Sequence, residues 1–377
     1  MKTGSIMIIA GEVSGDLHAA ALARALRRRD NDLKFFGIGG AELAKAGMEV
    51  HRHTCDMAVL GLSEVLRKYF FFRKTFNDMV ALLKERKPDV VLLVDYPGFN
   101  LPFAREAHRL GFKVIYYICP QVWAWRRGRI PAMARSVDRL LAIFPFEADV
   151  FKGTGLQVDF VGHPLVSATA AARTAPLVSL PWNGERKVAI LPGSRRQEVK
   201  LILPVMVSAA RLLKEKKENT GFIIAAASPE AKTWIEEILA AMGFSGQFAV
   251  AAGKTRQILR QADAAWVASG TATIETALME CPMVVVYRTA LLTYLAGRML
   301  IRVPFLGMVN IVAGKQICPE LIQGNATPEN LVQAIEPLLA SGKIRNDMLN
   351  ELKRVQGILG EPGADERAAG IVLRELS

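Results

Sequence analysis

The residues Ser269-Gly270-Thr271 form a small polar turn between a short apolar run and an amphipathic helical pattern. Backbone N–H groups at the start of a helix lack partners, and the helix dipole adds partial positive charge, so such a turn can bind a phosphate. Glu275 lies one helical turn beyond Thr271 on the same face, within reach of the hydroxyls of an attached sugar. An ordinary N-capped helix in an α/β domain fits these residues equally well.

A carboxylate, Asp95, ends the most apolar run of the chain, Val90–Val94. An aspartate at the carboxyl end of a central parallel strand lies where ligands bind in open α/β sheets, and its pKa can be tuned by burial and neighbouring charges. Asp95 is therefore a candidate general base for a hydroxyl group. The alternative is an aspartate that caps the turn after the strand.

An arginine turn, Gly193-Ser194-Arg195, follows another apolar strand pattern. Ser194 is expected to cap the next helix, and the Arg195 guanidinium can neutralise a phosphate leaving group through paired hydrogen bonds. In a chain this basic, Arg195 could instead lie on a solvated face.

The turn Gly11–His18 also joins a strand to a helix. Ser14 is expected to cap that helix, and Gly15 would let a ligand approach the backbone. The turn lacks both the Walker A and the G-x-G-x-x-G spacings, and a plain connection is the alternative. Gly253-Lys254-Thr255 is not a Walker A loop either, because Phe248 stands where the first glycine is required.

Two tryptophans, Trp123 and Trp125, follow Gln121 in the segment PQVWAWRR. Tryptophans two residues apart in a loop are costly to expose without use, so they could line a sugar or acyl pocket. Simple packing of the two rings explains them as well.

Residues 62–86 predict an amphipathic helix in which aromatic and basic side chains alternate. Phe71 falls opposite the apolar stripe that is expected to face the core, and Phe70 falls at the edge of that stripe. Arg73 falls on the stripe, where a charged side chain does not fit the prediction of a single helix. Exposed phenylalanines flanked by cations suit the headgroup region of an anionic bilayer. The flanking cations are Arg67, Lys68 and Lys74. An irregular helix that buries all of its phenylalanines is the alternative.

The candidate residues lie in a sequence where short apolar runs alternate with helical patterns. This alternation predicts βαβ units and parallel sheets. We expect two doubly wound α/β domains, residues 1–175 and 185–350, facing across a cleft, with a Pro- and Ala-rich linker between them. A last helix, about residues 360–377, is expected to pack back on the first domain. The expected strands are 5–10, 34–38, 90–95, 113–118, 140–144, 187–191, 221–226, 247–251, 264–268 and 283–287.

The composition limits the classes of function. The 377 residues carry a formal net charge of +12, which suits nucleic acid, an anionic membrane surface or phosphorylated substrates. No helix-turn-helix, zinc-finger or RNP-like motif supports nucleic acid. The four scattered cysteines favour a reducing compartment. The sequence also predicts neither a signal peptide nor a membrane-spanning helix.

Eight motifs in order over about residues 5–325 together resemble the lipid-A-disaccharide synthase family. They are GEVSGD, DYPGFN, PQVWAWR, FPFE, VGHP, LPGSRRQE, SGTATIE and the tripeptide Val309-Asn310-Ile311. The resemblance implies a GT-B fold of two Rossmann-like domains and an inverting glycosyl transfer. The donor would be UDP-2,3-diacylglucosamine, the acceptor 2,3-diacylglucosamine 1-phosphate, and the products UDP and a β-1,6-linked disaccharide.

The resemblance also implies roles for individual residues. Asp95 would be the general base, and Arg195, with Ser194, would steady the diphosphate. The remaining nucleotide contacts would be Ser269, Gly270, Thr271, Thr273, Glu275, Asn310, Glu320 and Gln323. The reacting sugars would be faced by Ser14, Gly15, Asp16, Asn100, Gln121 and Trp123. The family often has an acidic residue where Gly98 stands in DYPGFN, which puts a second carboxylate at that position in doubt.

The resemblance implies neither a cofactor nor a metal, and no D-x-D metal motif is evident in the sequence. It places the enzyme in the cytoplasm, peripheral on the cytoplasmic face of an anionic inner membrane, and leaves a homodimer open. Two rival interpretations remain: a UDP-sugar epimerase or a glycosyltransferase with another acceptor, and a lipid-binding protein without activity.

Overall fold

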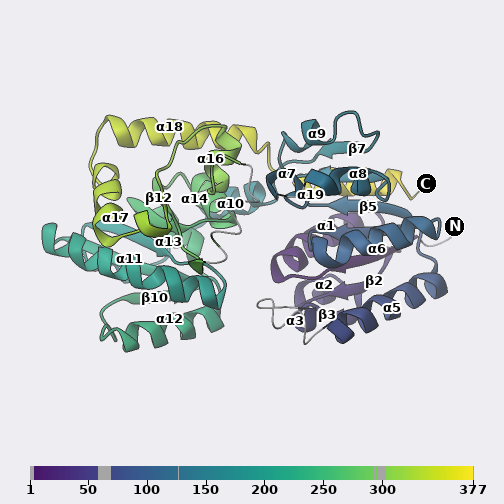
Figure 1. Ribbon diagram of the computed structural model, residues 1–377, viewed down its shortest axis with the longest axis horizontal. Helices are drawn as coiled ribbons and strands as arrows, with labels where there is room; N and C mark the ends of the chain where they lie inside the picture. The colour runs from purple at the N-terminus through teal and green to yellow at the C-terminus, as the bar shows by residue number, and fades with distance from the viewer. Residues whose placement is uncertain (1–3, 58–68, 126, 292–293, 295–302, 377) are drawn as a thin grey trace. The chain divides into compact units, whose positions relative to one another are not determined.

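The computed structural model describes residues 4–57, 69–125, 127–291, 294 and 303–376. The chain forms two compact units (Figure 1). Unit 1 comprises Met1–Pro164 and Leu359–Ser377, and unit 2 comprises Leu165–Ile358. Each unit contains a parallel sheet covered by helices on both faces, as the alternation of apolar runs and helical patterns predicts.

The sheet of unit 1 has seven strands in the order β3-β2-β1-β4-β5-β6-β7, and every neighbouring pair is parallel. The central strands are apolar and buried almost throughout, which is typical of a sheet covered on both faces. The strands are β1 Ser5–Ala10, β2 Lys34–Gly39, β3 Glu49–His53, β4 Val90–Val94, β5 Lys113–Tyr117, β6 Arg139–Ala142 and β7 Gln157–Phe160.

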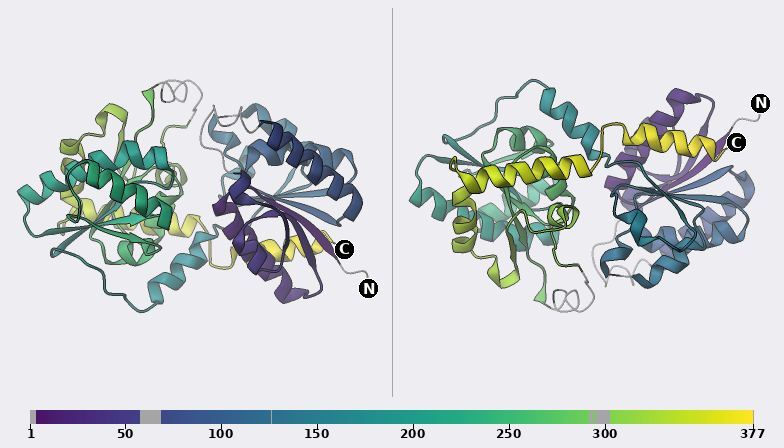
Figure 2. Two further views of the ribbon diagram at one scale, coloured as in Figure 1. Left: turned by 90° about the horizontal axis from the view of Figure 1, so that it is seen from below. Right: turned by 90° about the horizontal axis from the view of Figure 1, so that it is seen from above.

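Helices α5 and α6 pack together in unit 1, whereas α1 packs with α2 and α19. The helix α19 comes from the far end of the chain and returns to lie beside α1 (Figure 2). The helices of unit 1 are α1 Val13–Arg29, α2 Ala41–Lys45, α3 Thr54–Met57, α5 Tyr69–Arg86, α6 Pro97–Arg109, α7 Val122–Trp125, the 3₁₀ turn Arg127–Arg129, α8 Ile130–Ala134, α9 Glu147–Val150 and α19 Ala364–Arg374.

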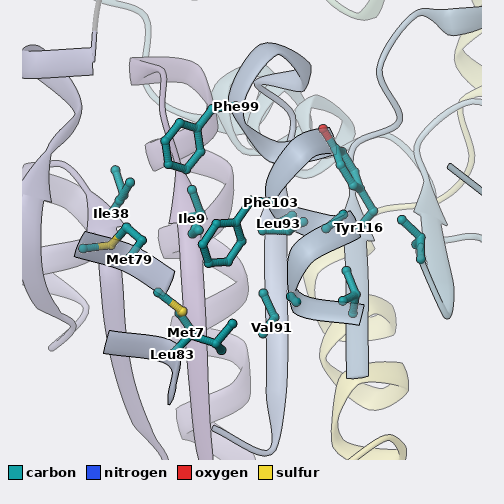
Figure 3. Packing of buried hydrophobic residues seen from close by; sticks show 14 of the residues in the cluster. Met7, Ile9, Ile38, Met79, Leu83, Val91, Leu93, Phe99, Phe103 and Tyr116 are labelled. Carbon is teal, nitrogen blue, oxygen red and sulfur yellow. The ribbon is translucent and has the colours of Figure 1, made fainter. Parts of the chain in front are cut away.

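Successive side chains of each strand point to opposite faces of the sheet. Met7 and Ile9 of β1 join one apolar cluster with Met79 and Leu83 of α5 and Phe103 of α6 (Figure 3). The intervening side chains of β1 point to the face that α1 covers. A continuous core on each face holds the carboxyl ends of the strands in fixed register.

The sheet of unit 2 has six strands in the order β10-β9-β8-β11-β12-β13, again parallel throughout. Its strands are β8 Arg186–Leu191, β9 Thr220–Ala226, β10 Ala249–Ala252, β11 Ala264–Ala268, β12 Met283–Tyr287 and β13 Glu320–Ile322. The turns after β8 and β11 therefore follow neighbouring strands and lie at the same edge of the sheet.

One face of the unit 2 sheet carries α11, which packs with α12 and α17, and the other carries α14, which packs with α10, α16 and α18. The helices are α10 Leu165–Thr174, α11 Arg196–Lys216, α12 Pro229–Ala241, α13 Thr255–Gln261, α14 Thr271–Leu278, α16 Met308–Ala313, the 3₁₀ turn Gln323–Asn325, α17 Pro328–Ile335, the 3₁₀ turn Glu336–Leu338 and α18 Lys343–Ile358.

The division of the chain differs from the expected boundaries of 1–175 and 185–350. Unit 2 begins at Leu165 because α10 packs on α13 and α14 of that unit. The Arg173 side chain of α10 forms an ion pair with Glu280 at 2.6 Å. This ion pair also holds α10 on unit 2. The chain returns to unit 1 at Leu359, and α19 is part of unit 1.

Candidate active site

Asp95 lies where β4 ends, in a turn that the backbone holds firmly. Its N–H donates to the Tyr117 carbonyl at 3.0 Å, and its carbonyl oxygen accepts from the Tyr116 hydroxyl at 2.5 Å. Asp95 and Tyr96 both have positive φ angles, 47° and 49°. This left-handed conformation is uncommon outside glycine, and strain of this kind clusters at functional sites. The turn places a partly buried carboxylate at the carboxyl edge of the sheet.

Asn100 holds this turn rather than facing a ligand. It is fully buried, and its amide nitrogen donates to the carbonyls of Ile9, Val94 and Asp95 at 3.3, 3.2 and 2.7 Å. The expectation that Asn100 faces the reacting sugars is therefore wrong, because its N–H groups are used by the main chain. Gly98 is exposed, and a Cβ added there would meet nothing within 4 Å.

Gly11 joins the turn after β1 to the turn after β4. A Cβ at Gly11 would lie 2.2 Å from the Tyr96 ring, so only glycine lets this ring pack there. The Tyr96 hydroxyl donates to the Met57 carbonyl at 2.9 Å. Burial, with the charge of Glu12 nearby, raises the pKa of Tyr96 to about 12, so the phenol stays protonated.

Asp16 is a helix cap and not a sugar contact. Its carboxylate is buried and accepts from the N–H groups of Gly40, Glu42 and Leu43 at 2.6, 3.0 and 3.2 Å. These are the donors at the start of α2 that lack helical partners. A Cβ at Gly40 would lie 2.6 Å from Asp16, so glycine is needed there. The expectation that Asp16 faces the sugars is corrected by these contacts.

Ser14 does not cap α1 as expected. The helix begins at Val13 with Glu12 as its N-cap residue, and no side chain makes a cap hydrogen bond. Ser14 lies inside the first turn and is exposed at the carboxyl edge of the sheet. Gly15 is buried beside it, and a Cβ there would make only ordinary contacts. Gln121 is exposed after β5.

Trp123 packs inside unit 1. It is 4% exposed, its indole N–H donates to Glu147 at 3.3 Å, and its ring meets Phe146 edge-on at 5.0 Å. The pocket interpretation is therefore wrong for Trp123, and the packing alternative holds. The side chain of Trp125 lies outside the described residues.

Glu147 is a buried carboxylate that the sequence interpretation missed. Besides Trp123, it accepts from the N–H groups of Ile143 and Phe144, both at 3.1 Å. Burial raises its pKa to about 7, although these hydrogen bonds act in the opposite direction. Glu147 thus ties the loop after β5 to the loop after β6. Glu147 is the last residue of the motif FPFE, and this motif was the feature of the sequence that could have indicated it.

His163 is a second missed residue, in the motif VGHP. It is 2% exposed, and its ring lies 5.3 Å from the Phe144 ring. Burial, with His18 nearby, lowers its pKa to about 3, so it is neutral at physiological pH.

Arg195 lies at the carboxyl edge of the unit 2 sheet. It is the N-cap residue of α11 and is exposed, and its guanidinium makes no hydrogen bond or ion pair with a described residue. Ser194 was expected to cap this helix; instead the Glu198 carboxylate reaches back and accepts the Ser194 N–H at 3.0 Å. Burial raises the pKa of Glu198, and Arg195 lowers it. Gly193, at φ 112°, leaves room for that carboxylate.

The turn after β11 has the form that an anion site requires. Gly270 is the N-cap residue of α14 with φ 138° and ψ −159°, a conformation available essentially to glycine alone. Ser269 is fixed by a hydrogen bond from its hydroxyl to the Leu306 carbonyl at 2.7 Å. Thr271 begins the helix and is exposed. The first N–H groups of the helix thus follow a half-buried glycine turn that leads into the exposed Thr271.

Thr273 differs from the expectation of a phosphate contact. It is fully buried, its hydroxyl donates to the Gly270 carbonyl at 2.7 Å, and it accepts the Val309 N–H at 3.3 Å. The residue therefore fixes the glycine turn from inside and joins α14 to α16.

Asn310 and Glu320 also support a loop from within. Asn310 is fully buried; its amide donates to the Cys318 carbonyl and to Glu320, both at 2.8 Å, and its oxygen accepts two backbone N–H groups. Glu320 accepts the N–H groups of Leu306 and Gly307, both at 2.9 Å. Asn310 has no hydrogen-bonding capacity left for a nucleotide, so its expected contact is corrected to a supporting role.

Gln323 is likewise bound to the main chain. Its side chain accepts the Thr289 N–H at 3.0 Å and donates to the Thr289 carbonyl at 2.6 Å. Glu275, in contrast, faces the start of α13. One of its oxygens accepts from Arg256 Nε at 2.8 Å, and its side chain is 19% exposed.

The described part of the aromatic helix, Tyr69–Arg86, buries Thr75, Met79 and Leu83, so its buried stripe differs in part from the expected one. Phe70 is 77% exposed, whereas Phe71 is partly buried and packs against the core of unit 1. Phe71 is therefore not the fully exposed residue that the sequence predicted. Arg73 and Lys74 are exposed, which removes the difficulty with Arg73. Arg67 and Lys68 lie outside the described residues.

Two kinds of feature are absent from the described part of the chain. No group of three or more His, Cys, Asp or Glu side chains there could hold a metal ion. No helix among those residues is long and apolar enough to cross a membrane.

Comparison with known proteins decides the family. The family model described as lipid-A-disaccharide synthetase matches residues 6–369. The chain belongs to the lipid-A-disaccharide synthase family. A lipid-A-disaccharide synthase of Syntrophus aciditrophicus is 43% identical over an alignment of 377 positions that covers 99% of this chain and 98% of that protein.

Solved structures confirm the GT-B fold expected of the synthase family. A co-structure of S. aureus MnaA with UDP has a TM-score of 0.66 at 14% identity, over 98% of this chain and 96% of that one. The structure of the glycotransferase of kitacinnamycin has a TM-score of 0.66 at 17% identity over 100% of both chains. All of the motifs except Val309-Asn310-Ile311, which lies in α16, begin at or just after the carboxyl end of a strand.

Proposed function

We propose that this protein transfers 2,3-diacylglucosamine from its UDP donor to the 6-hydroxyl of 2,3-diacylglucosamine 1-phosphate. The observation that carries the proposal is the exposed Arg195 beside the glycine turn of α14, with a guanidinium that makes no hydrogen bond or ion pair with a described residue. The two follow neighbouring strands, and together they supply a cation and a helix N-terminus for the diphosphate. Family membership supports the identity of the two sugars.

The proposed chemistry begins at the acceptor hydroxyl. The Asp95 carboxylate takes the proton of the acceptor 6-hydroxyl, and the hydroxyl oxygen forms the new bond to the donor anomeric carbon. The bond from that carbon to the diphosphate breaks, and UDP leaves with the electron pair. Attack from the face opposite UDP inverts the anomeric centre and gives the β-linkage.

Arg195 and the start of α14 stabilise the charge that develops on the leaving diphosphate, which in other enzymes a divalent cation can do. The proposed transfer therefore needs no metal. Activity should persist in EDTA, and a loss that Mg²⁺ restores would contradict this scheme.

The side chains that are buried and saturated act as supports in this proposal. Asn100 holds the Asp95 turn, and Thr273 and Asn310 hold the glycine turn and the loop next to it. Direct contacts are assigned to Asp95, Arg195, Thr271 and Glu275, with Ser14 and Gln121 exposed on the acceptor unit.

We also propose that unit 1 docks on an anionic membrane surface, the cytoplasmic face of the inner membrane, where acylated substrates reside. Phe70 is 77% exposed, and the exposed Arg73 and Lys74 follow it. An exposed aromatic ring beside cations suits the boundary between headgroups and acyl chains.

Mass spectrometry of the products from the two acylated glucosamines tests the proposed reaction. We expect a disaccharide 1-phosphate and one UDP for each disaccharide, and at least about 10²-fold less of both in the same time with the Asp95→Asn variant. Conversion of a UDP-sugar to its epimer without any disaccharide would contradict the proposal and favour an epimerase.

A further inference from the structure

The structure assigns Arg256 as a positioning residue that orients Glu275 so that its second oxygen receives the ribose hydroxyls of the donor nucleotide. The inference rests on the proposed function, because it takes Glu275 as the ribose contact. Arg256 directly follows Gly253-Lys254-Thr255 in the sequence. That tripeptide is not part of a Walker A loop.

The geometry joins two helices that start at the same edge of the sheet. Arg256 lies in the first turn of α13, and Glu275 lies one turn into α14. Arg256 Nε donates to Glu275 Oε1 at 2.8 Å. The other oxygen, Oε2, makes no hydrogen bond with a described residue. One oxygen is thus occupied by the guanidinium, and the other can accept hydrogen bonds.

The exposure of the Arg256–Glu275 ion pair indicates that it orients the Glu275 carboxylate and adds little to the stability of the fold. Arg256 is 37% exposed and Glu275 19% exposed. Ion pairs this accessible to water contribute little to folding. A glutamate side chain on a helix otherwise samples several rotamers, and binding must then pay for fixing one of them. An arginine that fixes the carboxylate beforehand removes that cost.

The planar guanidinium suits this task, because its N–H groups have fixed directions and match a carboxylate. Lys254 provides a contrast in the same segment. It is exposed and two residues from Arg256, and its side-chain ammonium has no hydrogen bond or ion pair with a described residue. A general attraction of positive charge for UDP would involve both residues, whereas positioning of Glu275 involves Arg256 alone.

Calorimetric binding of UDP and of 2′,3′-dideoxy-UDP to the full chain tests the inference. The dideoxy nucleotide keeps the uracil and the diphosphate but lacks the hydroxyls that Glu275 would bind. We expect Arg256→Gln to weaken UDP about tenfold, a loss typical of a misplaced charged hydrogen bond, and to leave the dideoxy nucleotide unchanged. Lys254→Gln removes the same charge and should change neither affinity.

The double variant Arg256→Gln with Glu275→Gln should bind UDP no more weakly than Glu275→Gln alone, because Arg256 acts through Glu275. The variants should melt within about 2 °C of the wild type, as expected for an accessible ion pair. Arg256→Lys should restore part of the affinity.

Equal weakening of UDP and the dideoxy nucleotide by Arg256→Gln would overturn the inference and make Arg256 a phosphate or base contact. Unchanged UDP binding in Arg256→Gln, together with weakened binding in Glu275→Gln, would also overturn it but leave the proposed function standing. Unchanged UDP binding in Glu275→Gln would instead remove the ribose assignment, and the inference with it.

Discussion

The Asn100 side-chain amide donates to the Asp95 carbonyl oxygen at 2.7 Å, from a position with no exposed surface. The same amide reaches the carbonyls of Ile9 and Val94, so one buried side chain joins the ends of β1 and β4 to the Asp95 turn. Because the turn has two consecutive positive φ angles, it needs such support to persist.

Asp95→Asn should abolish most of the turnover while leaving the fold intact. Removal of a general base costs on the order of 10²–10⁴-fold in rate. Asparagine tolerates the left-handed backbone at φ 47° and has the shape of aspartate, so the melting temperature should be unchanged. Asp95→Ala is a poorer variant, because alanine adds backbone strain there. A disaccharide assay with near-normal rates for Asp95→Asn would remove this carboxylate from the mechanism.

Asp16→Ala should destabilise unit 1 by about 1–3 kcal/mol, since it leaves the buried N–H groups of Gly40 and Leu43 without an acceptor. Ser14→Ala is the matched control, because Ser14 is exposed two residues away and makes no cap hydrogen bond. Its melting temperature should equal that of the wild type. Denaturant unfolding measures both, and a stable Asp16→Ala protein with a raised acceptor KM would restore the sugar-binding role of Asp16.

The sequence predicted the central strands well and missed three of the four strands at the edges of the sheets, β10 being the exception. The run 5–10 coincides with β1, and 90–95 differs from β4 by one residue. The missed strands are β3, β7 and β13, which all lie at an edge of a sheet. Edge strands are only half-buried and need few apolar residues, so they lack the signal that reveals a central strand.

The sequence motifs predicted where the site lies, but they did not predict the roles of its polar residues. Asp95, Arg195 and Gly270 fall on turns at the carboxyl edges, because a strand followed by a helix determines that location. Whether a polar side chain faces a ligand or the main chain depends on partners far along the chain. Asn100 bonds to Ile9, 91 residues away, and no local pattern contains that information.

Phe70→Ser should reduce binding to vesicles that contain anionic lipid and leave the melting temperature unchanged, because Phe70 is 77% exposed. Phe76→Ser is the matched control on the same helix. Phe76 packs edge-on against Phe99 and Phe103 at 5.7 Å, so its loss should lower the melting temperature. Vesicle co-sedimentation gives the comparison, and unchanged lipid binding of Phe70→Ser would exclude this ring as the contact.

Glu147→Gln should change how stability depends on pH. The pKa of Glu147 is raised from 4.5 to about 7 in the folded protein, chiefly by burial. The folded state therefore holds a proton that the unfolded state releases between these values. The unfolding free energy should fall as pH rises through this window, by at most about 1.4 kcal/mol for each pH unit from this group.

In Glu147→Gln that contribution is absent, and the amide must place a donor against Trp123 or against a backbone N–H. The variant should thus be clearly less stable than the wild type at pH 5, and the difference should shrink by pH 8. His163 acts in the opposite direction below its ordinary pKa, but it is common to both proteins and cancels in the comparison. Urea unfolding at the two pH values measures the difference. Parallel curves would mean that Glu147 is ionised throughout, held by its three hydrogen bonds against the effect of burial.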